Sequence, residues 1–191
     1  MHFFDWLYFK KNAIFLKIRA IKNFYFFRRM DIVLGHNVFI RRGKGKHFFG
    51  EKNVVFDNAI FEVHSANAVI TTGKDCFFSY GHIMVCSKAI TIGNNVWVGE
   101  YSSIRDATHE FSLLHPLGYL DDIIAPIIIG NNVWIGRGCI VLPGSIIGNN
   151  VIIAANAVVK GVCIDNGLYG GCPAKLIRLI KDKDRIVNST H

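Results

Sequence analysis

A branched aliphatic residue recurs at every sixth position in the segment from Pro126 to Val159: Ile129, Ile135, Val141, Ile147, Ile153 and Val159. A strand alternates with a period of two and a helix with a period of 3.6, so neither explains a step of six. The sequence IIGNN also occurs at both 128–132 and 146–150, an offset of three such steps. Self-similarity of this kind is the signature of a repeat architecture.

The repeat predicts an all-β solenoid, a triangular prism of parallel strands in coils of 18 residues. In each step an apolar residue points inward, and Gly with two polar residues turns a corner, because Gly and Asn tolerate a positive φ. Coils stack at about 4.8 Å and bury a core only as a stack. Five segments are interpreted as versions of one phrase: VLGHNVFI (33–40), ITTGKDCFF (70–78), ITIGNNVWV (90–98), IIIGNNVWI (127–135) and SIIGNNVII (145–153).

The pattern divides the chain into three regions. Residues 1–30 form a basic aromatic segment that we expect to be helical, residues 31–170 carry the repeat, and residues 171–191 are expected to form a helical tail. The two ends would cover the open strand edges of the prism. Between Ile92 and Ile129 the phrase is interrupted by a polar, irregular stretch, so we expect a loop at about 106–126 that leaves the prism. Loops on rigid scaffolds often carry function, and this one contains His109 and His115.

Charge and hydropathy narrow the classes of function. The net charge is +8, and the first 30 residues hold seven Lys or Arg against the single acid Asp5. This segment is either a helical cap on the prism or a surface that contacts an anionic membrane. No nucleic-acid-binding module accompanies the charge. No apolar run reaches the 18 residues of a membrane span and no signal-peptide pattern is present, so we expect a cytoplasmic protein, at the inner membrane face if the second interpretation holds. The five cysteines form no C-x-x-C pair and read as reduced thiols, mostly in the core, rather than metal ligands.

Three stretches together resemble a known family: ITIGNNVWVGEYSSIRDATHEF, then APIIIGNNVWIGRGCIVLPGSIIGNNVIIAANAVVKGV, then GGCPAKLIR. They are similar to the hexapeptide-repeat acyltransferases over about residues 70–180. Within these they look most like the galactoside, maltose and xenobiotic acetyltransferase branch and its polysaccharide O-acetyltransferase relatives. The resemblance implies a left-handed β-helix, a homotrimer with active sites between subunits, and acetyl-CoA as co-substrate without a metal.

The resemblance also implies roles for individual residues. His109 matches the catalytic histidine, a general base that takes the proton of an acceptor hydroxyl as that oxygen attacks the thioester; no acyl-enzyme is needed. Trp134 matches the aromatic residue at the acyl and acceptor end of the cleft, and backbone N–H groups near Gly136 would polarise the thioester oxygen. The remaining donor-binding positions are Ala155 and Lys160 beside the pantetheine arm and Lys175 and Arg178 near the CoA phosphates.

Four of these residues also have a structural interpretation. His109 would be a surface histidine, Trp134 a residue packed in a subunit interface, and Lys175 and Arg178 part of a solvated face. Trp97 occupies the same phrase position as Trp134 in an earlier coil, so the phrase alone does not define a site.

The acceptor half departs from the family pattern. Where the galactoside branch places Asn and Asp, this chain has Ser79 and Ser87. Ser79, Tyr80 and His82, together with Trp134, are the candidate acceptor contacts. With the basic aromatic start, this favours a saccharide acceptor at the membrane face, such as a capsular or O-antigen polysaccharide or its precursor.

Three alternatives stay open. In the first, the acceptor would be an amine in an amino sugar or an antibiotic, and His109 would serve equally as its base. A prism of the γ-carbonic anhydrase kind would need three converging His ligands; His64 and His82 are 18 residues apart and His109 and His115 six, with no evident third ligand. Finally, a solenoid can be a scaffold without activity, because fold does not imply function.

Overall fold

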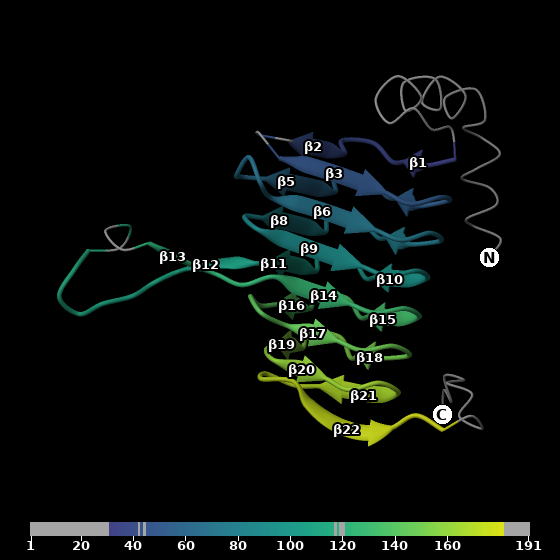
Figure 1. Ribbon diagram of the computed structural model, residues 1–191. Coiled ribbons are helices and arrows are strands. Elements are labelled where there is room, and N and C mark those ends of the chain that lie inside the picture. The colour runs from purple at the N-terminus through teal and green to yellow at the C-terminus, as the bar shows by residue number, and fades with distance from the viewer. Residues whose placement is uncertain (1–30, 42, 44, 117, 119–120, 182–191) are drawn as a thin grey trace.

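Parallel strands wind around a three-sided prism in the computed structural model (Figure 1). The structure describes residues 31–181 apart from 42, 44, 117, 119 and 120. Within these residues the fold is an all-β solenoid, as the repeat predicts. The strands follow one another in a fixed order around the prism. We name its faces A, B and C, and its edges AB, BC and CA, in the order in which the chain crosses them.

Each face is one sheet with one strand from each coil. Face A consists of β1 (Val33–Leu34), β4 (Val54–Val55), β7 (Phe77–Phe78), β10 (Val96–Val98), β15 (Val133–Ile135), β18 (Ile152–Ile153), β21 (Gly167–Gly170) and β22 (Lys175–Leu179). Face B consists of β2 (Phe39–Arg41), β5 (Ile60–Val63), β8 (Ile83–Cys86), β11 (Ser103–Arg105), β16 (Ile140–Val141) and β19 (Val158–Val159). Face C consists of β3 (Lys46–Phe49), β6 (Val69–Thr72), β9 (Ala89–Ile92), β14 (Ile127–Ile129), β17 (Ile146–Ile147) and β20 (Val162–Cys163).

The inward column of branched residues is confirmed. All six residues of the six-residue repeat are at most 1% exposed. Facing residues continue the column from coil to coil, as in the pairing of Ile129 with Ile147 and of Ile135 with Ile153. Four cysteines, Cys76, Cys86, Cys139 and Cys163, are buried in the same core, while Cys172 is exposed.

The 18-residue coil holds only between the strands β14, β15 and β16 and their partners β17, β18 and β19. Trp134 pairs with Ile152, an offset of 18, whereas Val54 pairs with Phe77, an offset of 23. Trp97 pairs directly with Trp134, so a single coil here has an offset of 37 residues. The extra length leaves at the BC edge as the antiparallel hairpin of β12 (Ala107–His109) and β13 (Asp122–Ile124), which projects from the prism (Figure 1). We call this hairpin and its connecting loop the arm.

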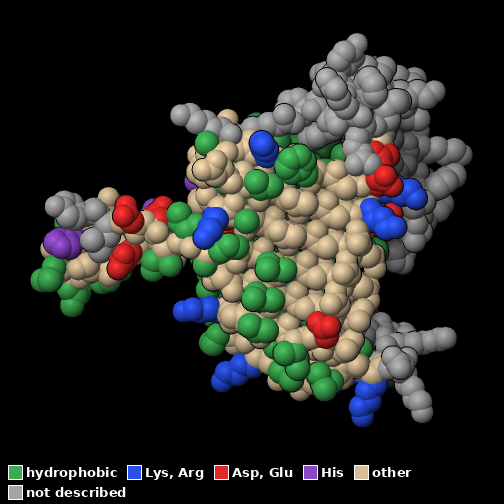
Figure 2. All heavy atoms as spheres, viewed as in Figure 1, with side chains coloured by type: hydrophobic (Ala, Val, Ile, Leu, Met, Phe, Trp, Pro, Cys, Tyr) green, Lys and Arg blue, Asp and Glu red, His purple; other side chains and the backbone are tan. Residues whose placement is uncertain are grey.

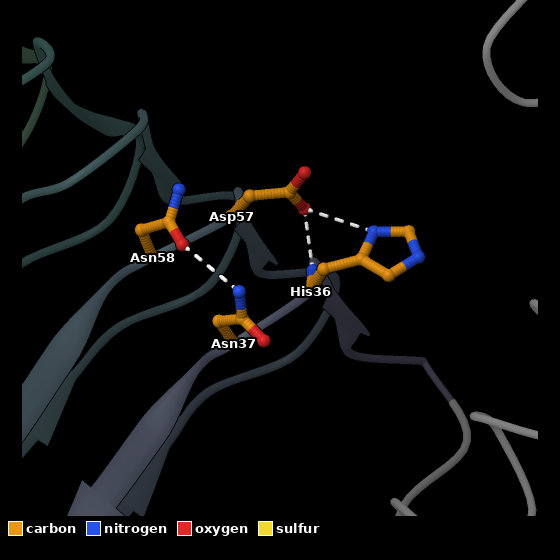
Figure 3. A network of polar contacts seen from close by, with 4 residues as sticks. All are labelled: His36, Asn37, Asp57 and Asn58. Carbon is orange, nitrogen blue, oxygen red and sulfur yellow. Dashed lines mark hydrogen bonds and ion pairs between the residues drawn. The ribbon is translucent and has the colours of Figure 1, made fainter.

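Asparagine side chains tie successive coils together at the edges. Along the CA edge, Asn95 donates to Asn132 at 2.9 Å, and Asn132 donates to Asn150 at 2.8 Å. Along the AB edge, Asn37 Nδ2 lies 3.2 Å from Asn58 Oδ1 (Figure 3). All five of these asparagines adopt the left-handed conformation at positive φ, which Asn accepts at low cost.

The five versions of the repeat phrase do not all turn at the same edge of the prism. The phrase at 33–40 turns at the AB edge between β1 and β2, whereas the other four phrases turn at the CA edge. Both edges need a residue with positive φ, which Asn37 and Asn95 supply alike. The same Gly-polar-Asn sequence therefore serves two corners. Beside Asn37, the carboxylate of Asp57 accepts the His36 backbone N–H and lies 3.4 Å from His36 Nδ1 (Figure 3).

The prediction of a helix after residue 171 is wrong for its described part. Lys175–Leu179 forms the strand β22, which runs antiparallel to β21 at the end of the stack (Figure 1). The last parallel strand has unpaired backbone groups, and a returning strand satisfies them where a helix would leave them open. The predicted helix at residues 1–30 lies outside the described residues, as do residues 182–191.

Candidate active site

His109 stands at the end of β12, on the arm and away from the prism. It pairs across the hairpin with Asp122, the first residue of β13, and its Nδ1 lies 2.7 Å from Asp122 Oδ1. The His109 side chain is 75% exposed. Because residues directly opposite in an antiparallel pair share one face of the ribbon, the register alone brings the two side chains together.

This pairing determines which nitrogen of His109 can act as a base. An ionised carboxylate only accepts hydrogen bonds, so Nδ1 carries the hydrogen and donates it to Asp122. In the neutral ring the other nitrogen, Nε2, then bears the free electron pair. The exposed ring presents Nε2 to solvent and to any ligand. An oriented His–Asp pair of this form is suited to proton transfer.

A groove runs along the AB edge near the middle of the prism. Its volume is about 340 Å³. It is lined by Gly99, Glu100, Trp134, Gly136, Arg137, Ile152, Ile153, Ala154 and Ala155. The structure thus brings together three residues singled out from the sequence, Trp134, Gly136 and Ala155. Glycine is required at 136, since an added Cβ would lie 2.7 Å from the backbone nitrogen of Ala155.

The backbone hydrogen bonds bear on the expectation that N–H groups near Gly136 polarise the thioester oxygen. The Gly136 N–H donates to Ile153 O at 2.8 Å, so it is occupied within the sheet and cannot polarise a thioester. The Ala155 N–H, in contrast, makes no hydrogen bond to another described residue. Ala155 lines the groove, so this N–H group lies at its border.

The three predicted basic residues lie outside this lining. Lys160 is exposed just after β19, and Lys175 and Arg178 are exposed on β22. Arg178 is nevertheless in register with the groove, because Trp134, Ile152, Leu168 and Arg178 pair in sequence across face A.

The acceptor candidates separate into two groups. Tyr80 is 41% exposed and packs against Phe56 with ring centroids 4.8 Å apart. Ser79 is half-buried before it, and its carbonyl oxygen lies 3.0 Å from His82 Nδ1.

His82 itself is 1% exposed and packs against Phe61 and Phe78. Desolvation by burial lowers the pKa of His82 to about 4. A ring enclosed in this way cannot reach an acceptor, so the prediction of His82 as a substrate contact is wrong. The sequence suggested His82 because it lies where the acceptor half departs from the family pattern, but the inward alternation of the coil places it in the core.

Other chemistry has little support among the described residues. Burial raises the pKa of the Cys76 and Cys139 thiols and raises that of Cys163 to about 11, which disfavours thiolate formation. In residues 31–181, as far as they are described, no three side chains of His, Cys, Asp or Glu converge on a point that would hold a metal ion. Within the same described residues, no helix is long and apolar enough to cross a membrane.

Comparisons with known proteins agree with this picture. The model of the bacterial transferase hexapeptide (six repeats) matches residues 126–161. The protein C18B11.09c of Schizosaccharomyces pombe, named as an acetyltransferase, is 40% identical over 111 residues, 58% of this chain and 53% of that protein. WbbJ of Escherichia coli, named as a lipopolysaccharide biosynthesis O-acetyl transferase, is 35% identical over 108 residues, 52% of this chain and 54% of WbbJ. The chain therefore spans about half the length of these curated relatives.

A solved structure extends the similarity. The hexapeptide-repeat acetyltransferase VCA0836 of Vibrio cholerae, complexed with acetyl coenzyme A, is 28% identical with a TM-score of 0.62, over 71% of this chain and 72% of that chain. The chain is therefore similar to hexapeptide-repeat acetyltransferases in sequence and in fold. The N-acyltransferase AntD of Bacillus cereus, at 20% identity and a TM-score of 0.72 over 80% of this chain and 82% of its own, shares the fold.

The sequence analysis did not identify Asp122 as the partner of His109, nor Arg137 and the remaining lining residues of the groove. Asp121 and Asp122 adjoin one another, and only the hairpin register shows which of them faces His109.

Proposed function

We propose that this hexapeptide-repeat protein is an acetyl-CoA-dependent O-acetyltransferase acting on a saccharide hydroxyl. The observation that carries the proposal is the His109–Asp122 pair, 2.7 Å apart on an exposed arm. It supplies an oriented base, and the groove at the AB edge supplies room for a thioester donor.

The reaction is a direct transfer. His109 Nε2 removes the proton of the acceptor hydroxyl as that oxygen attacks the thioester carbonyl carbon, which forms a C–O bond. The tetrahedral intermediate then collapses with cleavage of the C–S bond, and His109 returns the proton to the thiolate. The products are the acetyl ester and free CoA. Asp122 stabilises the imidazolium that forms between the two steps.

The donor would lie along face A. In our proposal its acetyl group sits beside Trp134, with its carbonyl oxygen near the Ala155 N–H, because aligned donors stabilise the developing oxyanion. From Trp134, the register row through Ile152 and Leu168 leads to Arg178. Arg178, Lys175 and Lys160 remain the proposed partners of the CoA phosphates. The acetyl coenzyme A complex of the Vibrio relative supports this class of donor.

The complete site requires two copies of the chain. The arm leaves at the BC edge, whereas the groove lies at the AB edge, and no described residue of the arm lines it. The arm projects away from the prism, and Figure 2 shows hydrophobic, acidic and histidine side chains along it. Phe111, Leu113 and Leu114 are 70%, 92% and 86% exposed, an apolar tip suited to contact another subunit. A homotrimer would place this arm beside the groove of its neighbour.

A saccharide is the acceptor class that we favour. Tyr80 offers an exposed ring and hydroxyl, and Ser79 a smaller polar group, while WbbJ is named for O-acetyl transfer in lipopolysaccharide biosynthesis. A capsular or O-antigen saccharide, or its precursor, fits these features. An amino sugar is the second candidate, since His109 would deprotonate an amine by the same geometry and the fold is shared with AntD.

Product analysis distinguishes the two acceptors. Thiol release from acetyl-CoA would be followed with free sugars, nucleotide-linked amino sugars and capsular oligosaccharides, and each product would be treated with hydroxylamine. We expect release with a saccharide and a hydroxylamine-labile ester. A stable amide would replace O- by N-acetylation, and no release with any acceptor would contradict acyl transfer.

A further inference from the structure

Asp106 is a fully buried carboxylate at the root of the arm. It lies between β11 and β12, three residues before His109, and is 0% exposed. A buried carboxylate is costly unless hydrogen bonds compensate for the lost water. Its position where the chain leaves the prism therefore calls for an explanation.

Three backbone donors of one turn surround this carboxylate. Oδ1 accepts the Ser87 N–H at 2.6 Å, and Oδ2 accepts the N–H groups of Lys88 and Ala89, each at 2.8 Å. The Cys86 thiol lies 3.4 Å from Oδ2. These four residues run from the end of β8 through the turn to the start of β9 in the preceding coil, so Asp106 fastens the outgoing strand of the arm to that coil.

The returning strand is fastened on the opposite side. Ala125 follows β13, and its N–H donates to Asp106 O at 2.9 Å, which closes the root of the hairpin. Its carbonyl oxygen accepts the Gly144 N–H from the next coil at 3.0 Å. Gly144 has a φ of +76°, and a Cβ there would lie 3.3 Å from the Ala125 Cβ. The arm is thus held between the coil before it and the coil after it.

These contacts bear directly on the His109–Asp122 pair. The ladder begins with Ala107 opposite Ile124, next to Asp106 and Ala125, and reaches His109 opposite Asp122 two residues later. A slip of one residue would turn one partner to the other face of the ribbon. We propose that Asp106 is a positioning residue, which fixes the register and direction of the arm and so aligns His109 with Asp122.

A buried polar residue elsewhere in the prism provides the matched control. Asn53 is also 0% exposed, donates to Thr72 Oγ1 at 2.8 Å and Gly73 O at 3.0 Å, and accepts the Cys76 N–H at 2.8 Å. It joins coils as Asp106 does, but lies before β4, with no hydrogen bond to the arm. Asn53→Asp and Asp106→Asn are the same isosteric exchange in opposite directions.

The first test is amide hydrogen exchange on the full-length protein at residues 107–109 and 122–124. In Asp106→Asn, one acceptor oxygen becomes an N–H₂ group facing backbone donors, and we expect the arm amides to exchange about tenfold faster or more. Asn53→Asp should leave them within about twofold of wild type. If Asp106→Asn does not fold, Gly144→Ala disturbs the other strand more gently and should produce the same localised change.

The second test rests on the proposed function and uses the acceptor that gives the greatest thiol release. We expect kcat of Asp106→Asn to fall about 10- to 100-fold, with the KM for acetyl-CoA within about threefold of wild type, because the groove is distant from the root. Arm exchange unchanged in Asp106→Asn, or equally accelerated in Asn53→Asp, would overturn the positioning role. If wild type transfers no acetyl group, the proposed function fails, while the exchange experiment still decides the role of Asp106.

Discussion

His109 and Asp122 face one another across a two-stranded ribbon, with Nδ1 and Oδ1 2.7 Å apart. The contact selects the ring tautomer, so changing the carboxylate should affect chemistry more than donor binding. In Asp122→Asn, the amide N–H₂ can donate to Nδ1, which would move the ring hydrogen to Nε2 and remove the base. We expect kcat to fall about 100-fold or more, with little change in the KM for acetyl-CoA.

The adjacent Asp121 provides the control for this comparison. It is exposed beside Asp122 but is not the residue paired with His109. Steady-state kinetics of Asp121→Asn should therefore resemble wild type. Equal losses in both variants would indicate a general effect of charge on the arm rather than a specific pair.

The groove can be tested by filling it. Ala155 is a small exposed residue in its lining, and Ala155→Tyr would occupy space that we assign to the donor. We expect the Kd for CoA, measured by calorimetry, to rise at least about tenfold with little loss of Tm. Ala66→Tyr, on an exposed turn between β5 and β6, should leave the affinity unchanged. Unaltered CoA affinity in Ala155→Tyr would place the donor elsewhere.

A site shared between subunits predicts complementation. His109→Ala and Ala155→Tyr should each be inactive alone, because one lacks the base and the other the donor groove. After co-refolding of equal amounts, random assembly would pair an intact arm with an intact groove in about a quarter of the sites, with activity to match. No recovery in verified mixed oligomers would mean that both groups act from one chain.

Acid should weaken the fold through His82. Burial lowers its folded pKa to about 4, below the ordinary value of 6.5 that the unfolded chain would have. Above pH 6.5 the ring is neutral in both states. As the pH falls from 6.5 towards 4, only the unfolded chain takes up the proton, so the free energy of unfolding decreases; at pH 5 this amounts to about 2 kcal/mol.

Replacing the titrating ring tests that contribution. His82→Phe keeps an aromatic side chain among Phe61 and Phe78 but has no group that titrates. Denaturant unfolding at pH 7 and pH 5 should show a smaller loss of stability on acidification in the variant than in wild type. An equal loss in both proteins would assign the acid sensitivity to other groups.

The sequence predicted the regular part of the molecule well, because there the position of a side chain in the repeat decides whether it points into the core or out of it. The six-residue column from Ile129 to Val159 is buried throughout, and Trp134, Gly136 and Ala155 do line one groove. These outcomes depend on the local alternation of inward and outward positions, which a step of six specifies directly. The strict 18-residue coil failed before β14, because longer turns lengthen a coil without breaking its pattern.

The failures involve contacts distant in sequence. Asp122 could not be distinguished from Asp121, because the hairpin register is fixed by its root at Asp106 and Ala125 rather than by its own residues. Residues 171–191 were predicted as a helical tail, but residues 175–179 pair with the open edge of β21 as a strand. His82 was predicted as an acceptor contact from its place in the divergent acceptor region, yet its ring packs against Phe61 and Phe78 in the core.

The most direct measurement is thiol release from acetyl-CoA by wild type, His109→Ala and His115→Ala, each with the best acceptor found. His115 lies six residues further along the same arm and is also exposed, so it controls for loss of a histidine there. Our account predicts that His109→Ala lowers acceptor-dependent release about 1,000-fold or more, while His115→Ala stays near wild type. Release undiminished in His109→Ala would contradict the assignment of the base and, with it, the proposed mechanism.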